Sequence, residues 1–229
     1  MSSRCRFAGL GVCVLAISLL FSACDSDSKT KKLSIKEANE IIQETLDQQV
    51  IRLTSDLTEI TPPEVWAETK HQIFKDSSSL ETFVVTEGKA ALAGIGFGGA
   101  GVTSIVPYDV NKDGTTDLVY AYSFGSGVHR SVISWMDLQT MTEHSPQGKA
   151  EPSVQNNSEQ TFRTYDLILD KEKNKIVVYQ IINKQHKEDL YQALSKYPSD
   201  KDIESMDLKQ EGLLYAEKDE LFYEAVDAD

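Results

Sequence analysis

The chain has 229 residues, of which 40% are hydrophobic and 26% are charged, so its composition is that of a folded protein and not of a disordered one. Its formal net charge is −13, and a surface this acidic repels phosphate backbones, which argues against nucleic-acid binding. The same charge is compatible with the binding of cations.

The N-terminal segment has the three parts of a secretory signal. Arg4 and Arg6 supply a positive start, residues 10–20 (LGVCVLAISLL) form an apolar stretch, and small residues precede Cys24. The apolar stretch is too short to span a bilayer comfortably as a mature helix. We therefore expect residues 1–23 to be a signal peptide. Its removal takes away both arginines and no acidic residue, which brings the net charge to −15.

The end of this segment, Leu20-Phe21-Ser22-Ala23-Cys24, resembles a lipobox, in which the chain is cleaved before a cysteine that is then lipidated. It departs from that pattern at Phe21, where lipoboxes prefer an aliphatic residue. The other cysteines, Cys5 and Cys13, both lie inside the expected signal peptide, so the mature chain would keep a single cysteine at its N-terminus. The resemblance implies an exported lipoprotein that is anchored to a membrane through acyl chains on Cys24. Ordinary cleavage after Ala23 is the alternative.

Residues 25–32 are polar and predict a short lipidated tether over residues 24–33. Ser34 and Glu37 have the spacing of a capping box, which predicts the start of a helix. Apolar residues then recur at helical spacing, at Ala38, Ile42, Leu46, Val50, Leu53 and Leu57. A second helix is expected from Pro62-Pro63 to about Lys75. We expect residues 34–76 to be helical and their apolar face to pack on the core, with a partner-binding role as the alternative.

From residue 81 to residue 229 the pattern is mainly that of β-strands, with β-branched and aromatic residues between polar turns. Strands are expected at Thr82–Val85, Val102–Tyr108, Leu118–Phe124, Val132–Leu138, Tyr165–Leu169, Ile176–Ile182, Gly212–Ala216 and Leu221–Val226. A polar loop is expected at residues 147–160 and a short helix at residues 188–196. No internal repeat is evident. We expect one α+β domain over residues 34–229, in which N-terminal helices precede a meandering antiparallel sheet of small-sandwich or partial propeller-like form.

One loop has the composition of a calcium site. Residues 109–117 read D-x-N-x-D-G-x-x-D, and calcium takes several hard oxygen ligands that a curled backbone can bring together. Gly114 permits the tight turn. The expected donors are the side chains of Asp109, Asn111, Asp113 and Asp117 and the backbone carbonyl of Thr115. The alternative is a solvated hairpin turn, in which Asn, Asp and Gly are also favoured.

The loop is not that of an EF-hand, because its twelfth position is Tyr120 in place of a bidentate glutamate and a strand follows it. Residues 105–138 instead resemble the calcium loops between strands in the FG-GAP and VCBS repeat families of exported and cell-surface proteins. That resemblance implies a structural Ca²⁺ ion that holds the bend between two strands. Those families usually repeat the loop, whereas it occurs once here.

Two other segments deserve a chemical interpretation. Gly94–Gly99 satisfies G-x-G-x-x-G, but a strand follows where a dinucleotide site requires a helix, so the segment from Gly94 to Gly101 is better explained as a flexible or tightly turning connection. Ser126, His129 and Arg130 are candidate ligand contacts in a turn that strand pairing could bring near the metal loop. A hydrolase would use Ser126 as nucleophile, His129 as base and Asp137 or Asp109 to orient the base.

Three hypotheses follow from the sequence. The first is a membrane-anchored, non-enzymatic binding or structural lipoprotein with one calcium-stabilised β-loop, whose partner would be an envelope protein or a small anionic ligand. The second is a cell-envelope hydrolase that uses Ser126 and His129. The third is an assembly or inhibitor module that acts through its N-terminal helices.

Overall fold

The computed structural model describes residues 31–46, 56–95, 101–124, 130–148, 164–170, 172–181 and 208–226. The chain divides into two units, Met1–Thr30 and Lys31–Asp229, and every described residue belongs to the second. The expected signal peptide, Cys24 and the helix expected at residues 188–196 lie outside the described residues. So does most of the polar loop expected at residues 147–160.

The first helix, α1, covers Ile35–Thr45 and begins where the capping box predicts. The Oγ of Ser34 accepts a hydrogen bond from the backbone N–H of Glu37 at 3.3 Å, and Oε2 of Glu37 accepts one from the N–H of Ser34 at 2.7 Å. This reciprocal pair satisfies donors that the start of a helix leaves open. The helix does not continue to Leu57, because Leu46 is already extended and Leu57 begins strand β1 (Leu57–Glu59).

The second helix, α2, covers Pro63–Thr69 and is shorter than the sequence predicts. It ends at Lys70, which has a left-handed backbone with φ of 58°, and the chain then enters strand β2 (Gln72–Asp76). All five residues of β2 are buried. A strand that is covered on both faces buries consecutive residues, whereas a helix that packs on one side does not. The prediction that residues 34–76 are helical is therefore wrong for β1 and β2.

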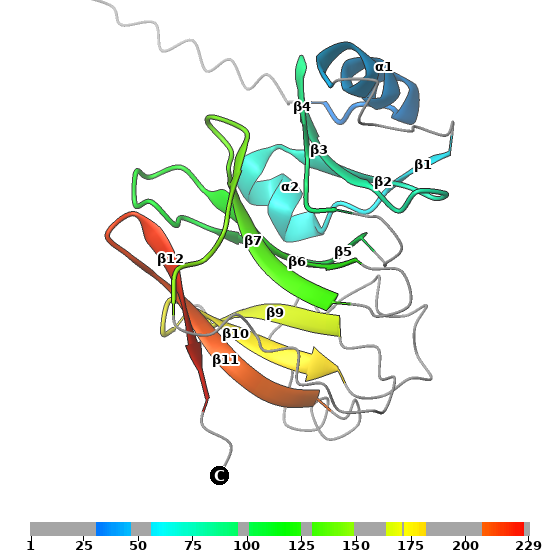
Figure 1. Ribbon diagram of the computed structural model, residues 1–229. Coiled ribbons are helices and arrows are strands. Elements are labelled where there is room, and N and C mark those ends of the chain that lie inside the picture. Colours follow the sequence, from blue (N-terminus) through cyan, green and yellow to red (C-terminus); the bar gives the residue numbers. More distant parts are fainter. Residues whose placement is uncertain are drawn as a thin grey trace, which may run out of the picture. The chain divides into compact units, whose positions relative to one another are not determined.

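Three four-stranded antiparallel sheets follow one another along the chain, and each is a simple meander (Figure 1). The first sheet contains β1, β2, β3 (Thr82–Thr86) and β4 (Lys89–Leu92). The second contains β5 (Gly101–Tyr108), β6 (Asp117–Phe124), β7 (Arg130–Asp137) and β8 (Thr142–His144). The third contains β9 (Thr164–Asp170), β10 (Lys175–Ile181), β11 (Leu208–Glu217) and β12 (Glu220–Ala225). The eight strands expected from the sequence are confirmed, although β11 begins four residues before the expected start at Gly212 and the others differ by one or two residues at their ends. Strands β1, β2, β4 and β8 are additional.

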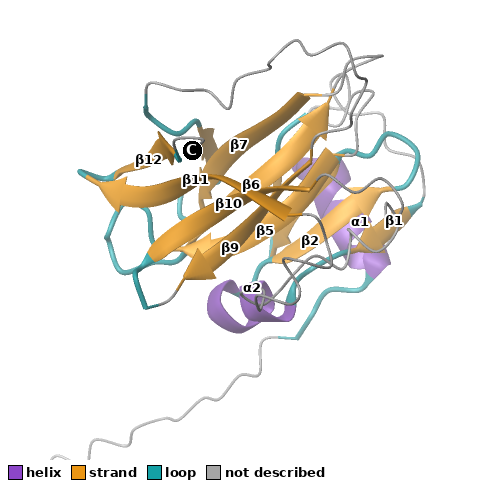
Figure 2. Ribbon diagram, turned by 90° about the horizontal axis from the view of Figure 1, so that it is seen from below, coloured by secondary structure: helices purple, strands orange, loops and turns teal. Residues whose placement is uncertain are grey.

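The sheets are stacked face to face, with α1 on the outer face of the first (Figure 1). Ala38 and Ile42 of α1 pack against Phe74 and Phe83 of the first sheet. The opposite face of the first sheet, together with Val65 of α2, packs against the second sheet. The third sheet covers the remaining face of the second, and strands β9–β11 lie over β5–β7 when the fold is seen from below (Figure 2).

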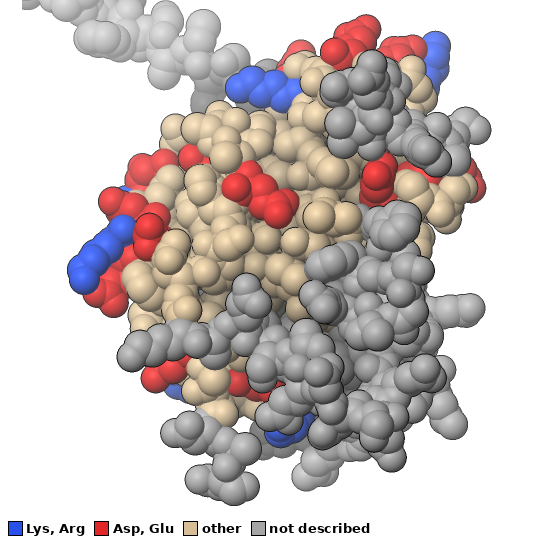
Figure 3. All heavy atoms as spheres, viewed as in Figure 1, with Lys and Arg blue, Asp and Glu red and all other residues tan. Residues whose placement is uncertain are grey.

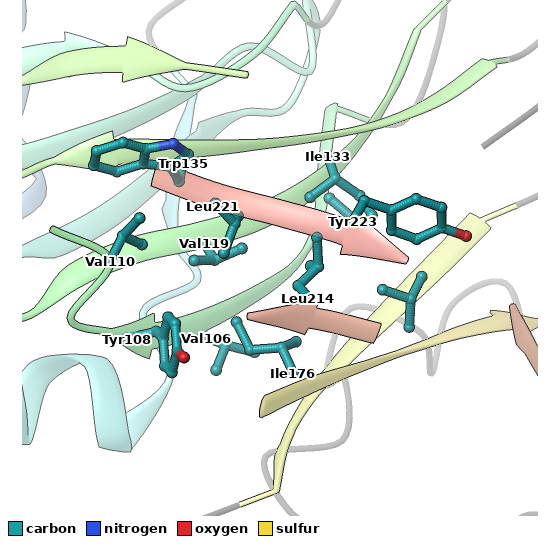
Figure 4. Packing of buried hydrophobic residues seen from close by; sticks show 12 residues of the cluster. Val106, Tyr108, Val110, Val119, Ile133, Trp135, Ile176, Leu214, Leu221 and Tyr223 are labelled. Carbon is teal, nitrogen blue, oxygen red and sulfur yellow. The ribbon is translucent and has the colours of Figure 1, made fainter. Parts of the chain in front are cut away.

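The second sheet is therefore the middle layer, and strand β6 shows the consequence. Its residues from Leu118 to Tyr122 are all buried, because alternate side chains face opposite neighbours. Leu118 and Tyr120 belong to the cluster shared with the first sheet, whereas Val119 lies in the cluster shared with the third (Figure 4). Within the described residues, two helices and three antiparallel sheets confirm the α+β class, and the face-to-face stacking agrees with the sandwich form of the prediction.

A polar contact holds the first and second sheets together at the start of β5. The pairing of β5 with β6 shifts register between Val102 and Ser104. The Nζ of Lys75 donates to the carbonyl oxygen of Val102 at 2.6 Å, and the N–H of Val102 donates to Oγ1 of Thr82 at 3.2 Å. Lys75 is only 6% exposed, and burial lowers the pKa of its ammonium group to about 8. The side chains of the first sheet thus satisfy backbone groups of the second.

Candidate metal centre

The predicted calcium loop connects β5 to β6 at one end of the middle sheet. Tyr108 and Asp117 form the pair of residues at which the two strands separate. Between them the backbone takes left-handed conformations at Lys112, with φ of 57°, and at Gly114, with φ of 87°. At these two residues the backbone turns in the opposite sense to a right-handed turn. Glycine adopts such a conformation without the steric cost that other residues carry.

Asp109 closes the loop into a ring. Its Oδ2 accepts a hydrogen bond from the N–H of Gly114 at 3.2 Å, which joins the first and sixth positions of the motif. The other oxygen of the same carboxylate, Oδ1, is buried and has no hydrogen-bond partner. A buried carboxylate oxygen without a partner is costly, so this atom is suited to a cation that would compensate its charge.

The middle of the loop is held by short polar side chains that bond to nearby backbone. Oδ1 of Asn111 accepts from the N–H of Asp113 at 3.1 Å, and Oδ1 of Asp113 accepts from the N–H of Thr115 at 2.7 Å. The Nδ2 of Asn111 also donates to Oδ2 of Asp113 at 3.0 Å. Asp109, Asn111, Asp113 and Thr115 are therefore fixed in one curled segment, as the motif predicts.

Asp117 differs from the other predicted ligands, because it is only 1% exposed and both of its oxygens face backbone donors. Oδ2 accepts from the N–H of Val110 at 3.1 Å, and Oδ1 accepts from the N–H of Leu138 at 3.4 Å. Burial, together with the nearby carboxylates of Asp137 and Asp113, raises the pKa of the Asp117 carboxyl to about 6. Asp117 thus ties the loop to the end of β7, and its negative charge adds to that of the corner.

A residue that the motif does not contain completes this corner. Gln139, in the turn between β7 and β8, donates from Nε2 to Oδ2 of Asp113 and to Oγ1 of Thr115, each at 2.8 Å. The turn is itself held by Oδ1 of Asp137, which accepts from the N–H groups of Gln139 at 2.8 Å and Thr140 at 3.1 Å. From the sequence, only the expected antiparallel pairing of β6 with β7 could have predicted that this turn lies beside the loop.

The donor set fits calcium through mixed oxygen chemistry and not through carboxylates alone. Within the described ranges, no group of three or more His, Cys, Asp or Glu side chains is close enough to hold a metal by itself. The other predicted donors, the amide oxygen of Asn111 and the backbone carbonyl of Thr115, are hard oxygens of the kinds that calcium takes as ligands. The unpartnered Oδ1 of Asp109 is the observation that favours an ion here over a plain hairpin turn.

The second candidate region lies at the opposite end of the middle sheet. Ser126 and His129 are outside the described residues, and Arg130 is the first residue of β7, paired with Phe124. Asp137 is the last residue of β7, seven positions along the strand and so about 23 Å from Arg130. The prediction that Arg130 lies near the metal loop is therefore wrong, because that loop joins the other ends of the strands.

The described glycines of the Gly94–Gly101 segment have explanations in packing. A Cβ at Gly94 would stand 2.5 Å from the ring of Tyr122, and one at Gly101 would stand 2.0 Å from the carbonyl oxygen of Leu80. The N–H of Gly94 also donates to Oε2 of Glu143 at 2.7 Å. The absence of a side chain at these two positions therefore serves close contact within the fold.

Comparison with known proteins adds no relative from which a function could be inferred. No family model, no curated protein and no solved structure matches the chain. In the part of the chain that the structure describes, no helix is both long and apolar enough to cross a membrane. Most of the described surface visible in Figure 3 is uncharged, and acidic side chains form separate patches on it with fewer basic ones, in keeping with the net charge.

Proposed function

We propose that this chain is an exported, lipid-anchored binding or structural module, non-enzymatic, whose β5–β6 loop is stabilised by one calcium ion. The main support for the calcium site is the arrangement of the Asp109 carboxylate. One of its oxygens closes the loop on Gly114, and the other is buried without a partner. A divalent cation would supply that partner and would also offset the charges of Asp113 and Asp117 in the same corner.

The side chains of Asp109, Asn111 and Asp113 and the carbonyl of Thr115 would hold the ion, with Asp117 as a further carboxylate. The ion supplies positive charge at a bend where three carboxylates otherwise repel one another. Its role is structural, since the loop joins β5 to β6 and contacts the β7–β8 turn. We expect weak affinity, on the order of 10⁻⁴ to 10⁻³ M, as in extracellular calcium modules.

The anchor is proposed from the N-terminal sequence. Cys24 follows a positive start and an apolar stretch, and the chain has no cysteine after it. The polar tether expected at residues 24–33 would separate the proposed lipid from the folded domain.

The acidic domain is a poor partner for nucleic acid, and we propose an envelope protein or a small anionic ligand as its partner, the latter at the Arg130 end of the sheet.

The packing of α1 weighs against a role through the N-terminal helices. Ala38 and Ile42, the buried residues of α1, are already used against the first sheet of the same chain. That face is therefore not available to another protein unless α1 leaves the sheet.

The calcium proposal is tested by thermal melting in calcium and in chelator. Asp113→Asn removes one charge from the loop at nearly constant shape, and Asp219→Asn makes the same change in the exposed β11–β12 turn as a matched control. We expect calcium to raise the melting temperature of the wild type and of Asp219→Asn, and to raise that of Asp113→Asn much less. If calcium shifts none of the three proteins, the loop is a plain turn.

The anchor is tested by palmitate labelling in a bacterial host. We expect label on the wild type and on Cys13→Ala, which changes a cysteine inside the expected signal peptide, but not on Cys24→Ala. Labelling of Cys24→Ala at the wild-type level would refute lipidation at this residue.

A further inference from the structure

The motif of the β5–β6 loop lacks the glutamate that a helical calcium loop has at its twelfth position, and the neighbouring turn can compensate for that loss. Calcium takes six to eight oxygens, and a helical calcium loop obtains two of them from a glutamate at its twelfth position. Here that position is Tyr120, which is fully buried and donates its hydroxyl to Oε2 of Glu143 at 2.6 Å. Because its hydroxyl is bonded to Glu143, Tyr120 cannot act as a ligand of the loop. Other residues must therefore stabilise the site.

Gln139 is the residue outside the motif whose side chain bonds directly to two of the proposed ligand residues. Its Nε2 lies 2.8 Å from Oδ2 of Asp113 and 2.8 Å from Oγ1 of Thr115, across 26 and 24 positions of sequence. Both Gln139 and Asp113 are exposed, so no core packing fixes either side chain. The hydrogen bonds themselves therefore determine which way the Asp113 carboxylate faces.

We infer that Gln139 is a positioning residue of the proposed calcium site, which recruits the β7–β8 turn to hold Asp113 and Thr115 in the orientation that binds the ion. The inference rests on the proposed calcium function. The amide of Gln139 is neutral, so it fixes a carboxylate without competing with the cation for charge. Its Nε2 donates to Oδ2 of Asp113, while Oδ1 of Asp113 is held by the N–H of Thr115. Partners of this kind orient metal ligands in many sites, and their loss commonly lowers metal affinity by tenfold or more.

The turn that carries Gln139 is organised independently of the ion. Oδ1 of Asp137 accepts from the N–H groups of Gln139 and Thr140, so the backbone of the turn keeps its shape when the Gln139 side chain is removed. Gln139→Ala therefore removes the two side-chain hydrogen bonds and leaves their support in place. Thr140→Ala alters the next residue of the same turn, which is also exposed, and serves as the matched control.

The experiment is calcium titration calorimetry on the full chain in detergent, with melting in chelator as the second measurement. We expect Gln139→Ala to weaken calcium binding by about tenfold and Thr140→Ala to leave it unchanged, while both variants melt in chelator within a degree or two of the wild type. If the wild type binds no calcium, the proposed site and this role are both refuted. If the wild type binds and Gln139→Ala binds equally well, the site stands and the role of Gln139 is refuted. A large drop in the chelator melting temperature of Gln139→Ala would assign the residue to fold stability and would also refute it.

Discussion

Replacement of Lys75 by methionine should change how the stability of this protein depends on pH. Lys75 lies in β2 between the first and second sheets, and burial lowers the pKa of its ammonium group to about 8. In the unfolded chain the same group titrates near its ordinary value of 10.5. Between pH 8 and pH 10.5 the unfolded chain therefore binds more protons than the folded one, and the free energy of unfolding rises with pH across this window.

The size of the effect follows from the difference between the two pKa values. A difference of about 2.5 pH units corresponds to at most about 3 kcal/mol, gained at up to about 1.4 kcal/mol per pH unit. Lys75→Met removes the cost of burying the charged ammonium group, which the wild type bears in full below pH 8. It also removes the hydrogen bond to the carbonyl oxygen of Val102, and that loss costs about 1–3 kcal/mol at every pH. The two effects nearly cancel near pH 7, so the slope is the informative quantity and the stability at one pH is not.

The assay is denaturant unfolding at several values between pH 7 and pH 9.5, and the ionisation of tyrosines near the upper end affects both variants below alike. Lys89→Met removes the same charge from an exposed position of β4 and is the matched control. We expect Lys75→Met to lose stability relative to Lys89→Met as pH rises, by about 1–2 kcal/mol over this interval. Parallel stability curves for the two variants would show that Lys75 titrates normally and would refute the reasoning.

Two further predictions concern packing. Ile42→Ala should lower the free energy of unfolding by about 2–5 kcal/mol, because Ile42 is fully buried between α1 and the first sheet. Ile35→Ala, at a position of the same helix that is 50% exposed, should lower it by less than about 1 kcal/mol. Equal losses in denaturant unfolding would contradict the position of α1. Gly94→Ala should lower the melting temperature more than Gly88→Ala. Both positions have positive φ, but a Cβ at Gly94 meets the Tyr122 ring at 2.5 Å and one at Gly88 meets nothing within 4 Å, so the reverse order would refute the close contact.

The sequence predicts β3 of the first sheet, but it misses β2 for a physical reason. The segment Gln72–Asp76 contains Lys75 and Asp76, which are normally exposed, and here both are buried in polar contacts. A burial pattern that includes charged residues is indistinguishable, in sequence, from the polar side of a helix. The short strands β4 and β8 have too few residues to show any period.

The candidate metal centre is predictable in part, because its motif is contiguous and its curl depends on local hydrogen bonds. Local hydrogen bonds link Asp109 to Gly114, Asn111 to Asp113 and Asp113 to Thr115. Gln139 is not predictable, since a glutamine in an exposed turn has no sequence feature that distinguishes it from its neighbours. Its role depends on how the β7–β8 turn lies against the loop, and only the three-dimensional structure provides that.

The layered fold separates the two chemically interesting regions of the chain, and this separation bears on what the ion can do. The middle sheet is covered on both faces, so its polar connections lie at the ends of its strands. The Asp109–Asp117 loop lies at one end and Arg130 at the other, about 23 Å apart along β7. An ion in the loop cannot contact a ligand held at the Arg130 end, because the buried length of β5, β6 and β7 lies between them. Calcium would therefore influence such a ligand only by stabilising the strands that both ends share, which is the structural role proposed here.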